Sequence, residues 1–496
     1  MSRLGTTEFI DAVVTPGTFR PWDADGLGLS AFDVSQWPSD YQQELADARE
    51  STGYEESVVV GEADIDGHRC AFVVGDFDFL AGSVGRRSCE LVIAAFRRAQ
   101  RDGLPVVASP CSGGTRMQEG TAAFALMTDV ALAVSEFRAA GGLVIGYLRH
   151  PTTGGVMATW GSLSTVTFGQ PGALTGFLGP RVYEQLNNEP FPSGIQCPEN
   201  LAATGVIDAV VEPDEFADVV ARFLRINSQR HVVSESSEAG SSEVTDSAGS
   251  AWEQVSRTRE SDRVSVDDLL DTLADVVRLS GTGEGQRSDA VSVAFGRLPD
   301  SGQAVLIVGT SREVEQPIDP AGLQTARRAF AIGSELNIPV VTLIDTWGGE
   351  LSAQAESQGI AGQIARTLVD LQQCGSVTVS VILGMGCGGA ALALLPADCV
   401  LVTQSGWLAP LPIEGAAIIR YRTIDRAPEL AEDLGVSARR LVADGVADRV
   451  IADVATVADC STLWREVYRA VGEQATHTFS ERMAARRSRH GLESVR

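Results

Sequence analysis

Short runs of apolar, β-branched residues alternate along the chain with longer segments whose apolar positions recur at helical spacing. Residues 71–74 and 305–308 have the composition of buried strands, and residues 90–101 and 324–336 have the spacing of amphipathic helices. Strands that alternate with helices are typical of parallel sheets covered by helices. The pattern therefore predicts an α/β protein.

This order of elements occurs twice, which indicates an internal duplication. Pro105 pairs with Pro339 and Gly154 with Gly388, and both pairs have the same separation along the chain, called here the repeat spacing. Two further landmarks keep the same order in both halves. The polar breaks at Gly67 and Gly302 come before the prolines, and residues 205–208 and 445–448 come after the glycines. We expect two similar domains in tandem.

An acidic, serine-rich stretch at residues 231–250 separates the two copies and offers almost nothing to bury. We interpret it as a flexible linker, with a phosphorylated or partner-binding acidic segment as the alternative. The predicted domains are therefore residues 1–230 and 251–496.

Residues 371–397 contain no charged side chain, a length that raises the question of a transmembrane helix. The segment divides, however, into a β-branched run at 377–383, a group of glycines, and an alanine- and leucine-rich run. A buried strand, a tight turn and a buried helix fit this division better than a membrane span.

Composition narrows the function. The formal net charge of −26 disfavours nucleic acid and anionic membranes as partners. All 39 Lys+Arg positions are arginine, which excludes Schiff-base chemistry on a lysine and the lysine of a phosphate-binding loop. Arginine still binds phosphates, so anionic substrates such as coenzyme A remain possible. The eight scattered cysteines indicate a reduced, cytoplasmic protein without a zinc ribbon, and residues 1–20 show no signal peptide.

Glycine pairs follow the predicted strands at Gly113–Gly114, Gly154–Gly155 and Gly388–Gly389. A strand that ends in glycines and enters a helix can direct several backbone N–H groups at one anionic atom. A close contact between helix and sheet is the simpler explanation for any single pair. Matching pairs in both halves favour two oxyanion cradles, a term used here for a turn whose backbone N–H groups point at one site. Such cradles suit thioester chemistry.

Several motifs resemble a known family. Residues 77–85, 112–119, 151–156 and 176–182 are similar to the carboxyltransferase β subunit of bacterial acetyl-CoA carboxylase, and residues 344–349, 356–359 and 413–416 to its α subunit. Together they cover most of the chain. The chain thus resembles the short, fused biotin-dependent acyl-CoA carboxyltransferases of actinobacteria.

The resemblance implies a crotonase-like fold in each half, with ββα units repeating in a spiral. It implies acyl-CoA on the first half, carboxybiotin on the second, and a homo-oligomer whose active site lies between subunits. Its candidate catalytic donors are Gly154 and Gly155 for the thioester oxygen and Gly389 and Ala390 for the ureido oxygen of biotin. Which cradle serves which oxygen stays open. In the family's mechanism the biotin nitrogen takes the α proton, so no protein base is required.

The resemblance also gives the candidate residues for binding coenzyme A and biotin: Ser112, Gly113, Gly114, Arg116, Gly179 and Gly388. Arg116 and Arg181 could meet the phosphates of coenzyme A, although structural ion pairs are the alternative. His150 adjoins a candidate loop, where an ordinary structural role is favoured. For Asp345 and Glu350, turn and cap roles are favoured over a catalytic carboxylate pair. The basic segment 482–489 is interpreted as a solvated face or a partner contact.

Absent features assign further roles to partners. With no lysine, biotin cannot be attached to this chain, so a biotin carboxyl carrier and a biotin carboxylase are expected as partners, and no metal is expected. Leu91 and Trp347 depart from the family's usual basic residue and proline, near the expected pocket. These two departures concern which acyl-CoA the protein prefers and whether it is catalytically active.

The favoured hypothesis is transfer of the carboxyl group to acetyl-CoA, giving malonyl-CoA for fatty acid biosynthesis. Propionyl-CoA or another acyl-CoA stays open as acceptor, because one methylene changes binding by only about 1 to 3 kcal/mol. A decarboxylase subunit acting on a malonyl-type thioester and a non-catalytic scaffold are the competing hypotheses.

Overall fold

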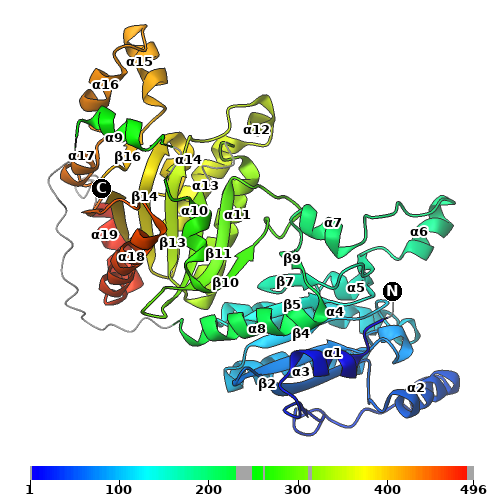
Figure 1. Ribbon diagram of the computed structural model, residues 1–496. Coiled ribbons are helices and arrows are strands. Elements are labelled where there is room, and N and C mark those ends of the chain that lie inside the picture. Colours follow the sequence, from blue (N-terminus) through cyan, green and yellow to red (C-terminus); the bar gives the residue numbers. More distant parts are fainter. Residues whose placement is uncertain (1–2, 231–248, 261–262, 311–315, 489–496) are drawn as a thin grey trace. The chain divides into compact units, whose positions relative to one another are not determined.

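The computed structural model describes residues 3–230, 249–260, 263–310 and 316–488 (Figure 1). Two compact units are found: unit 1 comprises the residues up to Arg225 together with Gly283–Gly285, and unit 2 comprises Ile226–Thr282 and the residues from Gln286 onward. Most of the predicted linker, residues 231–248, lies outside the described residues. The domain limits 1–230 and 251–496 stay a prediction.

Unit 1 is built on a mixed sheet. Its strands are, in spatial order, β1 (Arg20–Pro21), β2 (Val58–Ile65), β3 (His68–Gly75), β4 (Val106–Ser109), β5 (Val144–Leu148), β7 (Val166–Gly169) and β9 (Ala209–Val210). The pairs from β3 onward are parallel, whereas β1, β2 and β3 pair antiparallel. A small parallel pair, β6 (Thr152–Thr153) and β8 (Thr175–Gly176), stands apart. Both predicted features, a buried strand at 71–74 and parallel pairing, are confirmed.

The helices of unit 1 pack around this sheet or, like the helix Pro180–Asn187, extend away from it (Figure 1). They are α1 (Thr6–Val13), α2 (Ser39–Thr52), α3 (Arg86–Asp102), α4 (Gly120–Ala139), α5 (Gly154–Met157), α6 (Pro180–Asn187), α7 (Pro198–Ala203) and α8 (Pro213–Ser228), with 3₁₀ turns η1 (Leu80–Gly82) and η2 (Met117–Glu119). The amphipathic α3 ends at Gly103, whose φ of +65° suits glycine. Its apolar face joins the core with Val92, Ala95 and Phe96.

Unit 2 repeats this architecture. Its strands are, in spatial order, β10 (Ala274–Leu279), β11 (Val291–Arg297), β12 (Ala304–Thr310), β13 (Val340–Thr346), β14 (Thr378–Cys387), β15 (Cys399–Thr403) and β17 (Arg449–Ile451), with β16 (Trp407–Ala409) also pairing with β14. The pairs from β12 onward are parallel. The segment with no charged residue is therefore a buried strand followed by a short helix, as predicted.

The helices of unit 2 are more numerous than those of unit 1 among the described residues. They are α9 (Ala251–Arg257), α10 (Val266–Asp271), α11 (Pro320–Leu336), α12 (Ala353–Ser357), α13 (Ile360–Gln372), α14 (Gly388–Ala393), α15 (Ile413–Tyr421), α16 (Ala427–Asp433), α17 (Ala438–Ala443), α18 (Cys460–Ala475) and α19 (Phe479–Ser488), with the 3₁₀ turn η3 (Val457–Asp459). Helix α11 starts a turn earlier than its apolar spacing predicts, because Asp319 caps the N–H of Gly322 and Pro320 occupies the first helical position. In Figure 1, α3 and α4 lie side by side, as α11 and α13 do.

Helix α19 is fastened to its own unit by two buried arginines. Arg486 binds Asp398 at 2.7 Å and donates to the carbonyls at the end of α13, and Arg482 lies 3.2 Å from the same carboxylate. The Asp398 side chain has no exposed surface. Cations next to the C-terminus of a helix are favourable. Two arginines of the basic segment, at positions 482 and 486, thus face inward, whereas Arg487 is exposed and position 489 lies outside the described residues. For the remaining arginines a solvated face or a partner contact stays a prediction.

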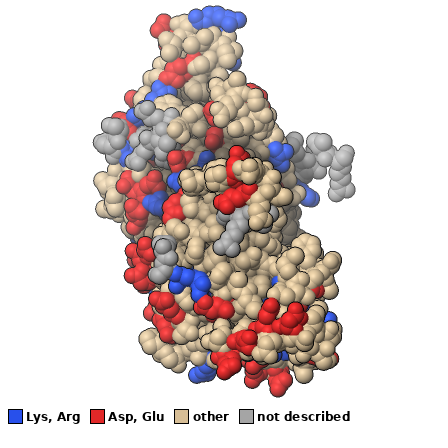
Figure 2. Space-filling view, turned by 90° about the vertical axis from the view of Figure 1, so that its right-hand side faces the viewer, with Lys and Arg blue, Asp and Glu red and all other residues tan. Residues whose placement is uncertain are grey.

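One described helical stretch, Met117–Ala139, is apolar and long enough to cross a membrane by length and composition, and one third of it is buried. A single such helix is weak evidence, because core helices pass the same test. Its outward side exposes Met117, Phe124 and Leu132. The surface seen in Figure 2 carries more acidic than basic side chains, separated by wide uncharged areas.

Candidate functional site

The first cradle forms where two loops of unit 1 meet beyond the carboxyl ends of β4 and β5. The N–H of Thr153 donates to the carbonyl of Ser112 at 3.0 Å, and the N–H of Ser112 donates to that of Pro151 at 2.7 Å. Gly154 has a φ of +66°, and a Cβ there would lie 3.1 Å from the Cα of Gly114. Glycine is required at 154 on both grounds.

The open N–H groups of this cradle differ from the predicted ones. Gly154, predicted as a donor, instead donates its N–H to the carbonyl of Phe177 at 3.0 Å, so that prediction is wrong. The N–H groups of Gly155 and Val156 have no acceptor among the described residues, because they lie in the first turn of α5. In the neighbouring loop the N–H of Thr115 is equally without one. Thr115 and Val156 were missed by the sequence reasoning.

The second cradle lies where β14 enters α14. Gly388 has a φ of +67°, close to the value at Gly154. The N–H groups of Gly389 and Ala390 lie in the first turn of α14 and have no acceptor in the described chain. The neighbouring Gly349 also has an open N–H, and a Cβ there would lie 3.7 Å from that of Ala390. The predicted donors Gly389 and Ala390 are therefore available.

The loops beside the two cradles share their backbone geometry. The N–H of Gly114 donates to Ser112 Oγ at 3.0 Å, and the N–H of Gly348 donates to Thr346 Oγ1 at 3.1 Å. The carbonyls of Gly114 and Gly348 accept from Val84 and Ile318, each at 2.9 Å. Every one of these pairs is related by the repeat spacing. The duplication thus extends to individual hydrogen bonds.

Most of the predicted binding residues around the first cradle shape the loop. The N–H of Gly113 donates to the carbonyl of Ala81 at 2.9 Å, and the hydroxyl of Ser112 accepts from Gly114. Gly179 precedes α6 and accepts from the N–H of Tyr183. Contact of Ser112, Gly113, Gly114, Gly179 or Gly388 with a substrate stays a prediction.

Arg116 is buried and fully engaged. Its guanidinium binds Glu56 through two hydrogen bonds of 2.8 Å and also reaches Tyr41 Oη and the carbonyl of Ser83. Neither Arg116 nor Glu56 has any exposed side-chain surface. The structure gives Arg116 the ion-pair role and not the role of a phosphate ligand. The side chain of Arg181 lies outside the described residues.

Three other candidates have structural contacts. Asp345 is buried, accepts from the N–H of Met385 at 2.8 Å, and pairs with Arg263 at 3.2 Å. Glu350 accepts from the hydroxyl of Ser352 at 2.6 Å. Leu91 is 7% exposed and packs in the core of unit 1, and its nearness to the expected pocket stays a prediction. Trp347, by contrast, is 43% exposed.

His150 is held in one tautomer at the start of the loop that carries the first cradle. Its Nδ1 accepts from the N–H of Leu174 at 2.9 Å, so the neutral ring carries its proton on Nε2. Burial lowers the pKa of His150 below its usual value of 6.5, and the charge of Arg3 acts in the same direction. The imidazole therefore stays neutral at pH 7.

We predict a pH-dependent stability from this histidine. Because its pKa is lower in the folded state, its contribution is present above about pH 6.5 and is lost as the pH falls. Melting temperatures measured between about pH 7.5 and about pH 5 should fall more steeply for the natural protein than for His150→Asn. The asparagine oxygen can replace Nδ1 as acceptor but does not titrate. Parallel curves would contradict the prediction.

No group of three or more His, Cys, Asp or Glu side chains that could hold a metal ion occurs among the described residues. The cysteines are free thiols, and burial raises the pKa of Cys111 and Cys387, which precede the loops of the two cradles. A thiol with a raised pKa is a poor nucleophile at pH 7. The backbone N–H groups without an acceptor are therefore the donors that these loops offer to an anionic oxygen.

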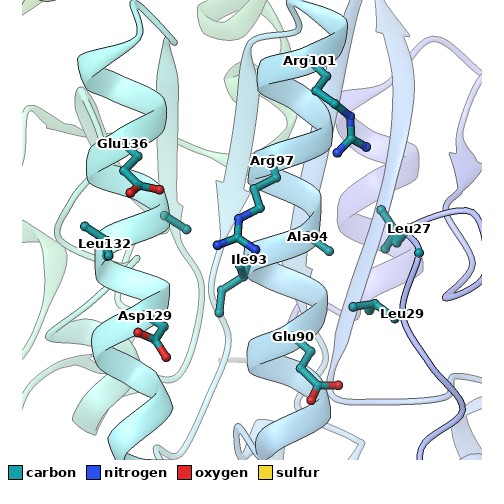
Figure 3. A pocket seen from close by; sticks show the side chains of 12 residues that line it. Leu27, Leu29, Glu90, Ile93, Ala94, Arg97, Arg101, Asp129, Leu132 and Glu136 are labelled. Carbon is teal, nitrogen blue, oxygen red and sulfur yellow. The ribbon is translucent and has the colours of Figure 1, made fainter.

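A groove of about 540 Å³ lies on unit 1, between α3, α4 and the segment 27–29 (Figure 3). Arg97 extends from α3 toward α4 there. The charged residues that line the groove are Glu90, Arg97, Arg101, Asp129 and Glu136, so carboxylates outnumber guanidiniums. An anionic substrate is not favoured in this groove, and the residues of the first cradle do not line it.

Comparisons with known proteins point to one family. A family model described as "Carboxyl transferase domain" matches residues 32–440. The "Probable biotin-dependent acyl-coenzyme A carboxylase beta3 subunit" of Mycobacterium tuberculosis is 43% identical over 465 residues, 92% of this chain and 91% of that protein. The "Acetyl-coenzyme A carboxylase carboxyl transferase subunits beta/alpha" of Salinispora arenicola is 34% identical over 481 residues, covering 92% of this chain and 84% of that protein.

Among solved structures, a hexameric transcarboxylase 12S with methylmalonyl-coenzyme A bound is similar at a TM-score of 0.73 and 20% identity, covering 95% of this chain and 90% of that one. At this identity the likeness concerns the fold alone. It confirms the crotonase-like fold expected for both halves.

Proposed function

Since the chain belongs to the carboxyl transferase domain family and is a biotin-dependent acyl-CoA carboxyltransferase, we propose that it carboxylates acetyl-CoA to malonyl-CoA. The relative from Salinispora arenicola bears an acetyl-CoA carboxylase name, which supports this acceptor. The more similar relative from Mycobacterium tuberculosis is named for acyl-CoA in general, so propionyl-CoA is the second candidate. Fatty acid biosynthesis would use the product.

The observation that carries the proposal is the pair of cradles. Each holds open N–H groups at the start of a short helix, and the hydrogen bonds beside them match at the repeat spacing. Carboxyl transfer involves two carbonyl oxygens that gain negative charge, one on the thioester and one on the ureido group. A fixed N–H donor to such an oxygen contributes roughly 3 kcal/mol in the transition state.

We assign the first cradle to the thioester. Loss of the α proton places charge on the thioester oxygen, and the N–H groups of Thr115, Gly155 and Val156 would stabilise it. Carboxybiotin supplies the carboxyl group when it is bound. The N–H groups of Gly389 and Ala390 fit its ureido oxygen, because they are open and Gly389 is exposed. His150 stays neutral and is not needed as a base.

We further propose that the enzyme is a cytoplasmic homo-oligomer that works with a biotin carboxyl carrier and a biotin carboxylase. The chain has no lysine to carry biotin. The exposed apolar side of α4 and the turn before it, with Met117 at 84%, Phe124 at 61% and Leu132 at 54%, is suited to contact between subunits. Free thiols support a reducing compartment.

Acyl-CoA specificity tests the proposal directly. The purified enzyme is supplied with its biotinylated carrier, the carboxylase partner, ATP and bicarbonate, and kcat/KM is measured on acetyl-, propionyl- and butyryl-CoA. Acetyl-CoA should give the highest value, with propionyl-CoA within about 10- to 200-fold of it. A preference for butyryl-CoA would refute the acetyl assignment, and inactivity on all three would refute the enzymatic function.

A further inference from the structure

The two matching loops differ most at one central residue. Gly113 in unit 1 corresponds to Trp347 in unit 2 at the repeat spacing. The backbone hydrogen bonds on either side are the same in both loops, so the exchange changes a side chain and not the path of the chain. The loop beside the second cradle therefore carries a large aromatic residue where the loop beside the first carries glycine.

Trp347 is also the exposed member of the protein's seven tryptophans, all of which are described. Its exposure is 43%, whereas Trp22, Trp160, Trp407 and Trp464 are buried at 7% or less, and Trp37 and Trp252 are half-buried. Leaving an indole in water forgoes the free energy of burying a large apolar surface. Tryptophan is enriched among the residues that contribute most to binding at interfaces.

The loop that holds Trp347 packs directly on the second cradle. A Cβ at Gly348 would lie 3.2 Å from the carbonyl oxygen of Cys387. A Cβ at Gly349 would lie 3.7 Å from the Cβ of Ala390. The two residues that follow Trp347 thus touch the turn that leads into the first turn of α14. Trp347 directly precedes Gly348 and Gly349 in the sequence, so it stands at the edge of this contact.

We propose that Trp347 is a specificity-determining contact for the biotin group, packing against its bicyclic ring while the N–H groups of α14 hold the ureido oxygen. This inference rests on the proposed function, because it takes biotin as the occupant of the second cradle. The ring has an apolar, sulfur-containing half and a polar ureido half. An aromatic wall beside fixed donors matches that division, since aromatic rings make favourable contacts with sulfur and aliphatic groups.

Kinetics of the reverse reaction provide the first test. The enzyme is assayed with malonyl-CoA as carboxyl donor and free biotin as acceptor. Trp347→Ala should raise the KM for biotin by about tenfold or more, equivalent to about 1.4 kcal/mol, and leave the KM for malonyl-CoA within about twofold. Trp347→Phe, which keeps an aromatic face, should stay within about threefold for both. An unchanged KM for biotin, or higher activity in Trp347→Ala because the indole blocks the site, would overturn the proposal.

Fluorescence quenching provides a second test that needs no turnover. Acrylamide should quench an accessible fraction of the emission in the natural protein, biotin should shield that fraction, and Trp347→Phe should lack it. A shielded Trp347 in a protein with no transferase activity would refute the proposed function while supporting the biotin contact. Quenching that biotin does not change would refute the contact, including the case in which another subunit covers Trp347.

Discussion

Replacing Gly389 with proline is expected to lower kcat by about 100- to 1,000-fold with little change in melting temperature. Proline removes the backbone N–H, and this N–H lies in the first turn of α14, where no helical hydrogen bond is lost. A new Cβ at position 389 would lie 3.1 Å from Cδ1 of Ile364, which belongs to a flexible side chain. The change therefore deletes one donor from the second cradle.

Gly389→Ala is the matched control, because it adds a Cβ and keeps the N–H. Its kcat should stay within about tenfold of the natural enzyme, against the larger loss from removing a donor. Both variants are compared in the steady-state assay with the carrier and by thermal unfolding. Equal activity of the proline variant and the alanine variant would show that this N–H does not stabilise the transition state.

Replacing Arg116 with methionine should lower the free energy of unfolding by about 3 to 5 kcal/mol, the largest stability effect we predict. The change leaves the carboxylate of Glu56 buried without its bidentate partner, and it removes a contact to Tyr41. Glu119, whose Oε1 accepts from Tyr41 at 2.5 Å, loses its cation as well. Urea unfolding measures the change.

Two variants isolate the cause of that loss. Arg86→Ala breaks an exposed pair with Glu90 on the same unit and should cost less than about 1 kcal/mol. Adding Glu56→Gln to Arg116→Met should restore part of the stability, since it removes the unpaired buried charge. If Arg116→Met and Arg86→Ala are equally stable, the buried network contributes little.

Much of the fold follows from local patterns in the sequence. The β-branched runs at 71–74 and 305–308 lie in β3 and β12, and most of the segment at 377–383 lies in β14. These patterns are informative because a fully buried strand needs a continuous apolar run, and a glycine at positive φ must follow where the chain turns sharply. The duplication presented each of these patterns twice.

The cradles were located from the sequence, but not all of their donors were. Whether the N–H of Gly154 is open depends on the carbonyl of Phe177, in a later loop, and no local pattern reports that bond. The repeat spacing offered a signal, since Ala390 corresponds to Val156 and not to Gly154. Arg116 was ambiguous for a similar reason, because its partner Glu56 is sixty residues away.

The contacts of α19 set the earliest time during synthesis at which unit 2 can complete its folding. Asp398 precedes its partner Arg486 by 88 residues, so the ribosome adds that much chain after the carboxylate has been made. At about 5 to 20 residues per second this interval lasts roughly 4 to 18 s. Until Arg486 is available, the carboxylate of Asp398 lacks that cation as a partner for the buried position that it takes in the folded protein. Unit 2 can therefore reach its native state only after residue 486 has left the exit tunnel.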